Sequence, residues 1–256
     1  MAHWYEGPLA SFDTETTGVD VESDRIVSAA LVLQSAPAAP VRTLTWLADP
    51  GVPIPEPARA VHGISDTQVR LYGRPPRLVV EEIALALRAE ADAGVPVVVM
   101  NAPYDLTLLD RELRRHHGHS LADRLTGRPL LILDPRVLDK HIDRYRKGHR
   151  TLADLCAHYG VALSAAHNAA ADALASLELV RVLGSRHPAA LGALSPAELH
   201  VRQTVWHAAQ ARGLQAWFDR AGTPEQVDTA WPLRPERCTC GRRPIPGQQH
   251  RCGTAA

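Results

Sequence analysis

The sequence predicts an α/β protein built on a mixed five-stranded sheet flanked by helices, followed by a C-terminal helical extension and a short Cys/His tail. Three strand-like segments fall within residues 8–47, separated only by short, turn-rich spacers. Beyond them, apolar strand-like segments alternate with helical patterns. Strands first and strand–helix alternation afterwards indicate a mixed sheet with helices on its faces.

The composition is that of an ordinary soluble protein, with 45% hydrophobic and 22% charged residues among 256. Lys+Arg and Asp+Glu both total 28, which excludes a global basic field, so any grip on a polyanion must be local. No apolar run approaches the ~20 residues that span a bilayer, and the N-terminus lacks a signal pattern. We therefore expect a cytoplasmic protein without a membrane partner.

The first three strands are expected at residues 8–14, 25–33 and 41–47. Because the spacers 18–24 and 36–40 are short, adjacent antiparallel pairing is the simplest arrangement.

The remaining strands are expected at residues 95–100 and 130–133. The first of these is continuously apolar without alternation, which suits a central strand covered on both faces. A helix follows with Pro103 near its first position, and Asp134 is interpreted as a capping residue before Pro135. Further helices are predicted at residues 56–61, 76–93, 135–142, 151–159, 168–184 and 196–218.

Two acids end the first strand. Successive side chains of a strand point to opposite faces, so Asp13 and Glu15 share one face while Phe12 and Thr14 share the other. Two like charges at such a short distance repel each other, and each raises the pKa of the other. Such a pair therefore usually exists to hold a cation.

Three further residues can complete this site. Asp105 follows the buried strand at a strand-to-helix turn, and sites in open α/β sheets form at such strand ends. His167 precedes a helix, and Asp172 lies within its first turns. The five-residue spacing allows His167 to occupy the helix entry while the helix holds Asp172 toward the sheet.

Three segments together resemble the motifs of the DEDD superfamily of 3′-to-5′ exonucleases, His subtype, which includes the proofreading epsilon subunit of bacterial DNA polymerase III, ribonuclease T and oligoribonuclease. They read Phe12-Asp13-x-Glu15-Thr16-Thr17-Gly18, Asn101-Ala102-Pro103-Tyr104-Asp105 and His167-Asn168-Ala169-x-x-Asp172. The resemblance covers roughly residues 8 to 185. It implies a ribonuclease H-like fold and stepwise removal of nucleoside monophosphates from a 3′ end.

By this resemblance Asp13, Glu15, Asp105 and Asp172 would bind two Mg²⁺ or Mn²⁺ ions, which favour oxygen ligands. Ions about 3.5–4 Å apart stabilise both the attacking and the leaving oxygen of an in-line displacement. Histidine, with an unperturbed pKa of ~6.5, suits deprotonation of the attacking water, so His167 is the expected general base.

Each of these residues has a simpler reading when taken alone. An Asp-x-Glu pair is more often solvated, Asp105 can be a helix N-terminal charge, and His167 can be a surface residue. Their joint appearance in order favours catalysis. The alternative is a noncatalytic nucleic-acid-binding or polymerase-associated module on the same fold.

The substrate-binding candidates are Thr16, Thr17, His62, Asn101 and Tyr104. The expected partner is nucleic acid with a free 3′ end, and single-stranded DNA is the first expectation. The motifs themselves do not choose between DNA and RNA, because proofreading enzymes and RNA-trimming enzymes share them. A DNA polymerase partner and a homodimer are further expectations.

Two basic segments have different interpretations. Residues 144–150 carry four permanent positive charges around one tyrosine, so they form either a solvated loop or a phosphate-binding segment. Arg111, Arg114 and Arg115 are interpreted as a solvated helix face.

The expected division is an exonuclease domain at 1–186, a helical extension at 187–235 and a tail at 236–256. The tail offers the ligand set of a structural zinc site, although the first two cysteines are closer than usual. These ligands are Cys238, Cys240, His250 and Cys252. Free thiols or an occasional disulfide are the alternative. Cys156 lies in an apolar helical pattern and is expected to be a buried structural thiol.

Overall fold

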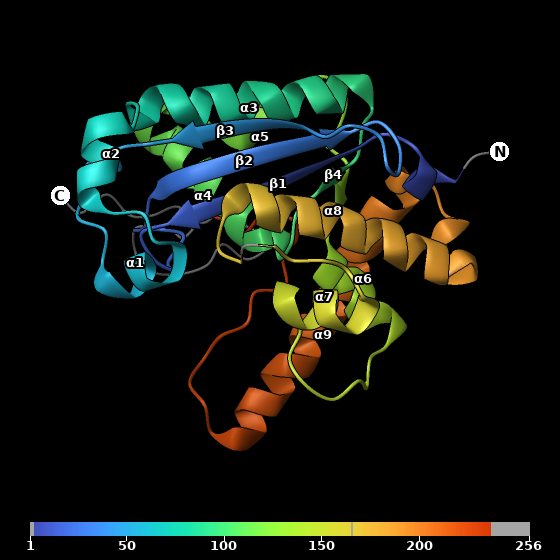
Figure 1. Ribbon diagram of the computed structural model, residues 1–256. Coiled ribbons are helices and arrows are strands. Elements are labelled where there is room, and N and C mark those ends of the chain that lie inside the picture. Colours follow the sequence, from blue (N-terminus) through green and yellow to red (C-terminus); the bar gives the residue numbers. More distant parts are fainter. Residues whose placement is uncertain (1–2, 165, 237–256) are drawn as a thin grey trace.

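The computed structural model describes residues 3–164 and 166–236 and places one mixed five-stranded sheet at the centre, in the order β3-β2-β1-β4-β5 (Figure 1). The strands are β1 (Leu9–Thr16), β2 (Ile26–Gln34), β3 (Arg42–Leu47), β4 (Val97–Val98) and β5 (Ile132–Leu133). β1, β2 and β3 pair antiparallel, whereas β4 runs parallel to both β1 and β5. The predicted sheet is confirmed.

The helices surround this sheet. They are the short 3₁₀ turn Trp4–Glu6, α1 (Glu56–His62), α2 (Asp66–Tyr72), α3 (Pro76–Ala93), α4 (Ala102–His117), α5 (Leu121–Arg124), α6 (Pro135–Ile142), α7 (Leu152–Tyr159), α8 (Ala169–Arg186), the π-helical turn Pro188–Gly192 and α9 (Pro196–Ala221). None of the helices within the described ranges is long and apolar enough to cross a membrane.

α2, α5 and the π-helical turn were not predicted. α2 buries only one apolar side chain, Val69, so it leaves almost no periodic pattern in the sequence. Its start is set locally, because Ser65 accepts a hydrogen bond from the backbone N–H of Gln68.

The sheet separates two apolar layers. α3 and α4 pack on one face against Phe12 and Leu31, whereas α8 covers the other face against Leu9 and Val32 (Figure 1). Neighbouring residues of β1 therefore enter different layers, as the period of a strand requires. The same alternation directs Asp13 toward α8 and Thr14 toward α4.

β4 is shorter than the predicted strand at 95–100, although its environment is the one expected. Val97, Val98 and Val99 are fully buried, and β4 pairs on both sides. Regular pairing ends because the chain turns at Asn101, whose φ of 59° lies in the left-handed region, and α4 begins at the next residue.

α9 covers the edge of the sheet at β5. Gln203 donates to the carbonyl of Ile132 and accepts from the N–H of Asp134, while His200 Nδ1 accepts from the N–H of Ile132. The backbone groups of this edge are thus satisfied by side chains of α9. After α9 the chain returns, and Trp231 enters the core, where its indole N–H donates to Asp134 and its ring lies against that of His200. The three-part division of the chain remains a prediction.

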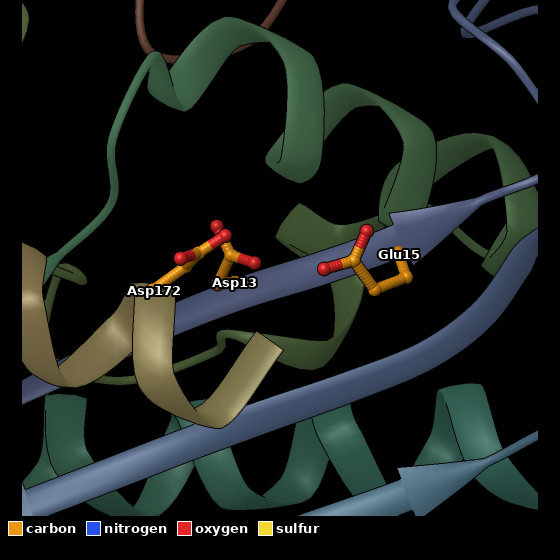
Figure 2. A group of neighbouring side chains, drawn as sticks. All are labelled: Asp13, Glu15 and Asp172. Atoms are coloured by element: carbon orange, nitrogen blue, oxygen red, sulfur yellow. The ribbon is translucent and has the colours of Figure 1, made fainter. Parts of the chain in front are cut away.

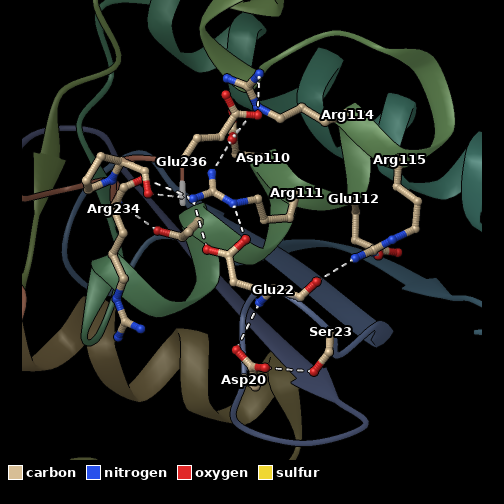
Figure 3. A network of polar contacts seen from close by, with 12 residues as sticks. Asp20, Glu22, Ser23, Asp110, Arg111, Glu112, Arg114, Arg115, Arg234 and Glu236 are labelled. Atoms are coloured by element: carbon tan, nitrogen blue, oxygen red, sulfur yellow. Dashed lines mark hydrogen bonds and ion pairs between the residues drawn. The ribbon is translucent and has the colours of Figure 1, made fainter. Parts of the chain in front are cut away.

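The interpretation of the α4 arginines as a solvated face is wrong for Arg111, which is only 7% exposed. Its guanidinium donates to Glu22 and Asp110, and also to the carbonyls of Arg234 and Pro235 (Figure 3). The returning C-terminal segment covers this part of α4, so the arginine joins the helix, the 18–24 loop and that segment.

Candidate active site

Three carboxylates meet where β1 ends beside the first turns of α8. Asp13, Glu15 and Asp172 each offer an oxygen atom within 4.8 Å of the others. Figure 2 shows the Asp172 side chain pointing from α8 toward the acids of β1. The strand–helix juxtaposition expected from the sequence therefore exists for these three acids.

Local sequence features fix the position of Asp172. The side chain of Asn168 accepts from the N–H of Ala171 and caps α8. Ala173 and Leu177 on the same helix are fully buried against the sheet. Asp172, adjacent to the buried stripe of α8, is thereby held over β1.

The acids are electrostatically unfavourable as they stand. Burial raises the pKa of Asp13 well above its usual value, and the charges of Asp105, Glu15 and Asp172 raise it further. Burial, with Asp172 and Asp105, raises the pKa of Glu15 to about 7. Asp172 Oδ1 is buried without a hydrogen-bond partner in the described part of the chain. Buried polar atoms are rarely unpaired, so this oxygen points to a ligand.

Asp105 approaches from the opposite layer and lies outside the three-acid group. Thr14 donates its hydroxyl hydrogen to Asp105 Oδ1 at 2.6 Å, and burial raises the pKa of Asp105 to about 7. The charge of Asp105 nevertheless acts on Asp13. The contribution of Thr14 was missed, although the alternation of β1 predicted which face it occupies.

Asp134 does more than the predicted capping of α6. Besides accepting from the N–H of Arg136, its carboxylate accepts from the N–H groups of Asn101 and Ala102. It therefore fixes the start of α4, the helix that carries Asp105. The side-chain oxygen of Asn101 accepts from Arg136, so this substrate-binding candidate faces the basic side chain.

The two histidine candidates lie near the acids. His167 is exposed, has a φ of 64°, and donates its backbone N–H to Asp172 Oδ2 at 3.0 Å. His62, at the end of α1, is half-buried, and its pKa is lowered by burial and by the charge of His167. Its Nδ1 accepts from the N–H of Ile64, while its buried Nε2 has no hydrogen-bond partner within the described ranges.

Thr16 and Tyr104 form a second group beside Glu15. Their hydroxyl oxygens are 2.7 Å apart, and both hydroxyls lie against the carbonyl of Gly18. Burial raises the pKa of Tyr104 to about 12, so it remains a hydrogen-bonding phenol at neutral pH. Tyr104 reaches this place from the first turn of α4.

Thr17 has a different environment from Thr16. It is buried, and its hydroxyl donates to Asp24 at 2.7 Å. A Cβ atom at Gly18 would lie 2.6 Å from the Asp24 carboxylate, so only glycine allows this approach. The hydroxyl of Thr17 is therefore bound within the 18–24 loop.

Two arginines of the basic run 144–150 serve an internal role. Arg146 and Arg150 both donate to Asp139, which is fully buried and also accepts from the hydroxyl of Tyr159. The interpretation of the whole run as either solvated or phosphate-binding is thus wrong for these two side chains.

The cysteine predictions have different outcomes. Cys156 is buried, as predicted, and burial raises the pKa of its thiol to about 11. Cys238, Cys240, His250 and Cys252 lie outside the described residues.

Known proteins share this fold. E. coli exonuclease I, solved in complex with a dT13 oligonucleotide, is 16% identical, with a TM-score of 0.60 over 71% of this chain and 42% of its own. Exonuclease I from Methylocaldum szegediense is 19% identical, with a TM-score of 0.59 over 83% and 45%. Exonuclease X in complex with 5′ overhanging duplex DNA is 16% identical, with a TM-score of 0.53 over 76% and 99%.

The chain thus spans less than half the length of the exonuclease I structures, and their likeness confirms the ribonuclease H-like fold. A search of curated proteins found no match. The exonuclease family model RNase_T matches residues 11–180, which include the four motif acids and His167. The chain belongs to this exonuclease family.

Proposed function

We propose that the protein is a metal-dependent 3′-to-5′ exonuclease that hydrolyses phosphodiester bonds of DNA or RNA and releases nucleoside monophosphates. The observation that carries this proposal is that Asp13, Glu15 and Asp172 each bring a carboxylate oxygen within 4.8 Å of the others, and that Asp172 Oδ1 is buried without a hydrogen-bond partner among the described residues. Membership of the exonuclease family supports the same chemistry.

The acid cluster fits divalent cations. Its donors are carboxylate oxygens, which suit Mg²⁺ and Mn²⁺, and bound cations would relieve the repulsion that raises the pKa of Asp13. We propose that Asp13, Glu15, Asp105 and Asp172 hold two such ions. When bound, the ions supply positive charge for the attacking and leaving oxygens of the displacement.

His167 is the proposed general base. It stands at the entry of α8, where its side chain is exposed while its backbone N–H is anchored to Asp172. A base must reach the water that it deprotonates, and this placement leaves the imidazole accessible from the substrate side. Assignment to the His subtype depends on this role.

The remaining candidates are proposed to hold the terminal nucleotide. Thr16 and Tyr104 present hydroxyls beside Glu15, and the buried Nε2 of His62 has no hydrogen-bond partner of standard geometry among the described residues. Asn101 and Thr17 would act indirectly, by holding the start of α4 and the 18–24 loop in place, because the side chain of Asn101 binds Arg136 and that of Thr17 binds Asp24.

Single-stranded DNA is the proposed substrate, since a related fold was solved with a dT13 oligonucleotide. A polymerase partner, a homodimer, a cytoplasmic location and a zinc-binding tail remain predictions. A further exonuclease I structure is a complex with SSB-Ct, so a protein partner is also proposed for this chain.

The test is the rate at which 5′-labelled single strands of DNA and RNA become shorter from their 3′ ends in the presence of Mg²⁺. We expect Asp13→Asn and Asp172→Asn each to lower the rate by at least about 10²-fold, because each removes charge from the proposed ion site. Asp92→Asn is the matched control, since Asp92 lies exposed on α3, where its ion pair is with Arg88 of the same helix. Binding without any hydrolysis by the wild type would instead indicate the noncatalytic module.

A further inference from the structure

A groove of about 840 Å³ lies outside the acid cluster. Its walls are α6, the loop 143–150, α9 and the returning segment 223–235, which lie together at the end of the molecule away from α3 (Figure 1). α9 and the returning segment follow the residues matched by the family model, which end at 180.

The groove lining carries a net positive charge, because five permanently positive side chains, Arg136, Lys140, Arg144, Arg150 and Arg234, face three acids, Glu22, Asp134 and Asp228. Arg136, Lys140 and Arg144 line it, and within the described ranges none of them forms an ion pair with an acid. The carboxylate of Asp134, also in the lining, is occupied by backbone N–H groups. Glu22, at the rim, pairs with Arg111. A polyanion would find the three cations available.

Exposed aromatic rings stand on two walls of the same groove. Tyr145, on the loop, is 85% exposed, with the Arg144 guanidinium 5.5 Å from its ring centroid, and Trp217, on α9, is 53% exposed. Between these walls, Trp206 stacks on His141 with ring centroids 3.7 Å apart. Cations that can bind phosphates, together with open aromatic faces, form the surface that single-stranded nucleic acid uses, since every base can stack.

The groove also reaches the element that carries the fourth acid. Asn101 and Pro103, at the start of α4, belong to its lining, and Asp105 follows in the first turn of that helix. A strand whose 3′ end lies at the acids can therefore continue past the start of α4 into the groove.

We propose that this groove binds the part of a single-stranded nucleic acid that lies 5′ of the terminal nucleotides, an inference that rests on the proposed function for its direction. Arg136, Lys140 and Arg144 contact phosphates, and Tyr145 and Trp217 stack on bases. The groove thereby gives the enzyme a preference for strands longer than those that the acid site alone accommodates.

The test is fluorescence anisotropy of a labelled thymidine 15-mer in EDTA, where binding is measured without hydrolysis. We expect Arg144→Glu and Trp217→Ala each to weaken binding at least about fivefold, and Arg144→Gln to lower the salt slope by about one. Lys147→Glu is the matched control, because Lys147 lies on the same loop but outside the groove lining. The affinity of this variant for the 15-mer should differ from that of the wild type by less than twofold. Equal melting temperatures verify that the variants are folded.

A second readout compares substrates of different length. With Mg²⁺, Arg144→Glu should raise KM for the 15-mer by a larger factor than KM for a dinucleotide. Wild-type affinity in both groove variants, or an equal loss in Lys147→Glu, would overturn the proposal. Groove-dependent binding without hydrolysis would sustain the groove and refute the proposed function.

Discussion

Asp139 and Asp172 are both carboxylates inside the fold, and their surroundings are opposite. Asp139 is fully buried, yet Arg146, Arg150 and Tyr159 supply hydrogen bonds to both of its oxygens. Asp172 faces Asp13 on the same side of the sheet, and its Oδ1 has no partner among the described residues. The chain thus carries the counter-charge for one acid within its own sequence and leaves the other acid without it.

This difference separates a structural acid from one that awaits a ligand. A buried charge is tolerated when it is paired and hydrogen-bonded. The loop 143–150 supplies that pairing to Asp139 through Arg146 and Arg150, so these two cations are not available to a ligand. At the acid cluster no arginine or lysine of residues 3–164 and 166–236 forms an ion pair with Asp13, Glu15 or Asp172, and the pKa of Asp13 rises because burial and three other acids act on it.

The largest expected effect is on the paired acid. Asp139→Asn leaves Arg146 and Arg150 without their counter-charge, so the free energy of unfolding should fall by about 3–5 kcal/mol. Urea denaturation measures this loss. The control is Asp154→Asn, because Asp154 belongs to the capping box of α7 at the surface and bonds only its own helix start at Thr151, so its replacement should lower the free energy of unfolding far less. Equal losses for the two variants would contradict the comparison.

A smaller effect of opposite sign is expected at the acid cluster. The pKa of Glu15 is raised from 4.5 to about 7, so the folded state binds the proton more tightly than the unfolded chain does. Without metal, the stabilisation that protonated Glu15 contributes is therefore complete below pH 4.5 and is lost as the pH rises toward and past about 7. Glu15→Gln should stabilise the fold by about 1–2 kcal/mol at pH 8 and have little effect at pH 4.

Urea denaturation in EDTA at both pH values measures this difference. A destabilised Glu15→Gln protein at pH 8 would show that the acid contributes to the fold, as Asp139 does.

Sequence periodicity predicted much of this arrangement, because the alternation of β1 and the apolar run before α4 are local signals. The three motifs then identified Asp13, Glu15 and Asp172, which the structure brings together. The burial of Arg111 was not predictable in this way, since it depends on a segment more than a hundred residues further along the chain.

The same reason applies to the groove. Its cations come from α6 and the following loop, while Trp217 comes from α9, so no single stretch of sequence contains it. The basic run also contains five basic side chains besides its tyrosine, and the sequence does not indicate which of them turn inward to Asp139. Non-local packing decided both outcomes.

The most direct test of the unpaired acids is thermal unfolding with and without Mn²⁺. At an Mn²⁺ concentration 100-fold above Kd, binding should stabilise the wild type by about 2.7 kcal/mol, which corresponds to a rise in Tm of about 5–10 °C. In EDTA, Asp13→Asn should melt at or above the wild-type temperature, because repulsion is relieved, and its Mn²⁺ shift should be lost. Asp92→Asn should keep the full shift. An Asp13→Asn protein that melts lower in EDTA and retains the Mn²⁺ shift would contradict the account.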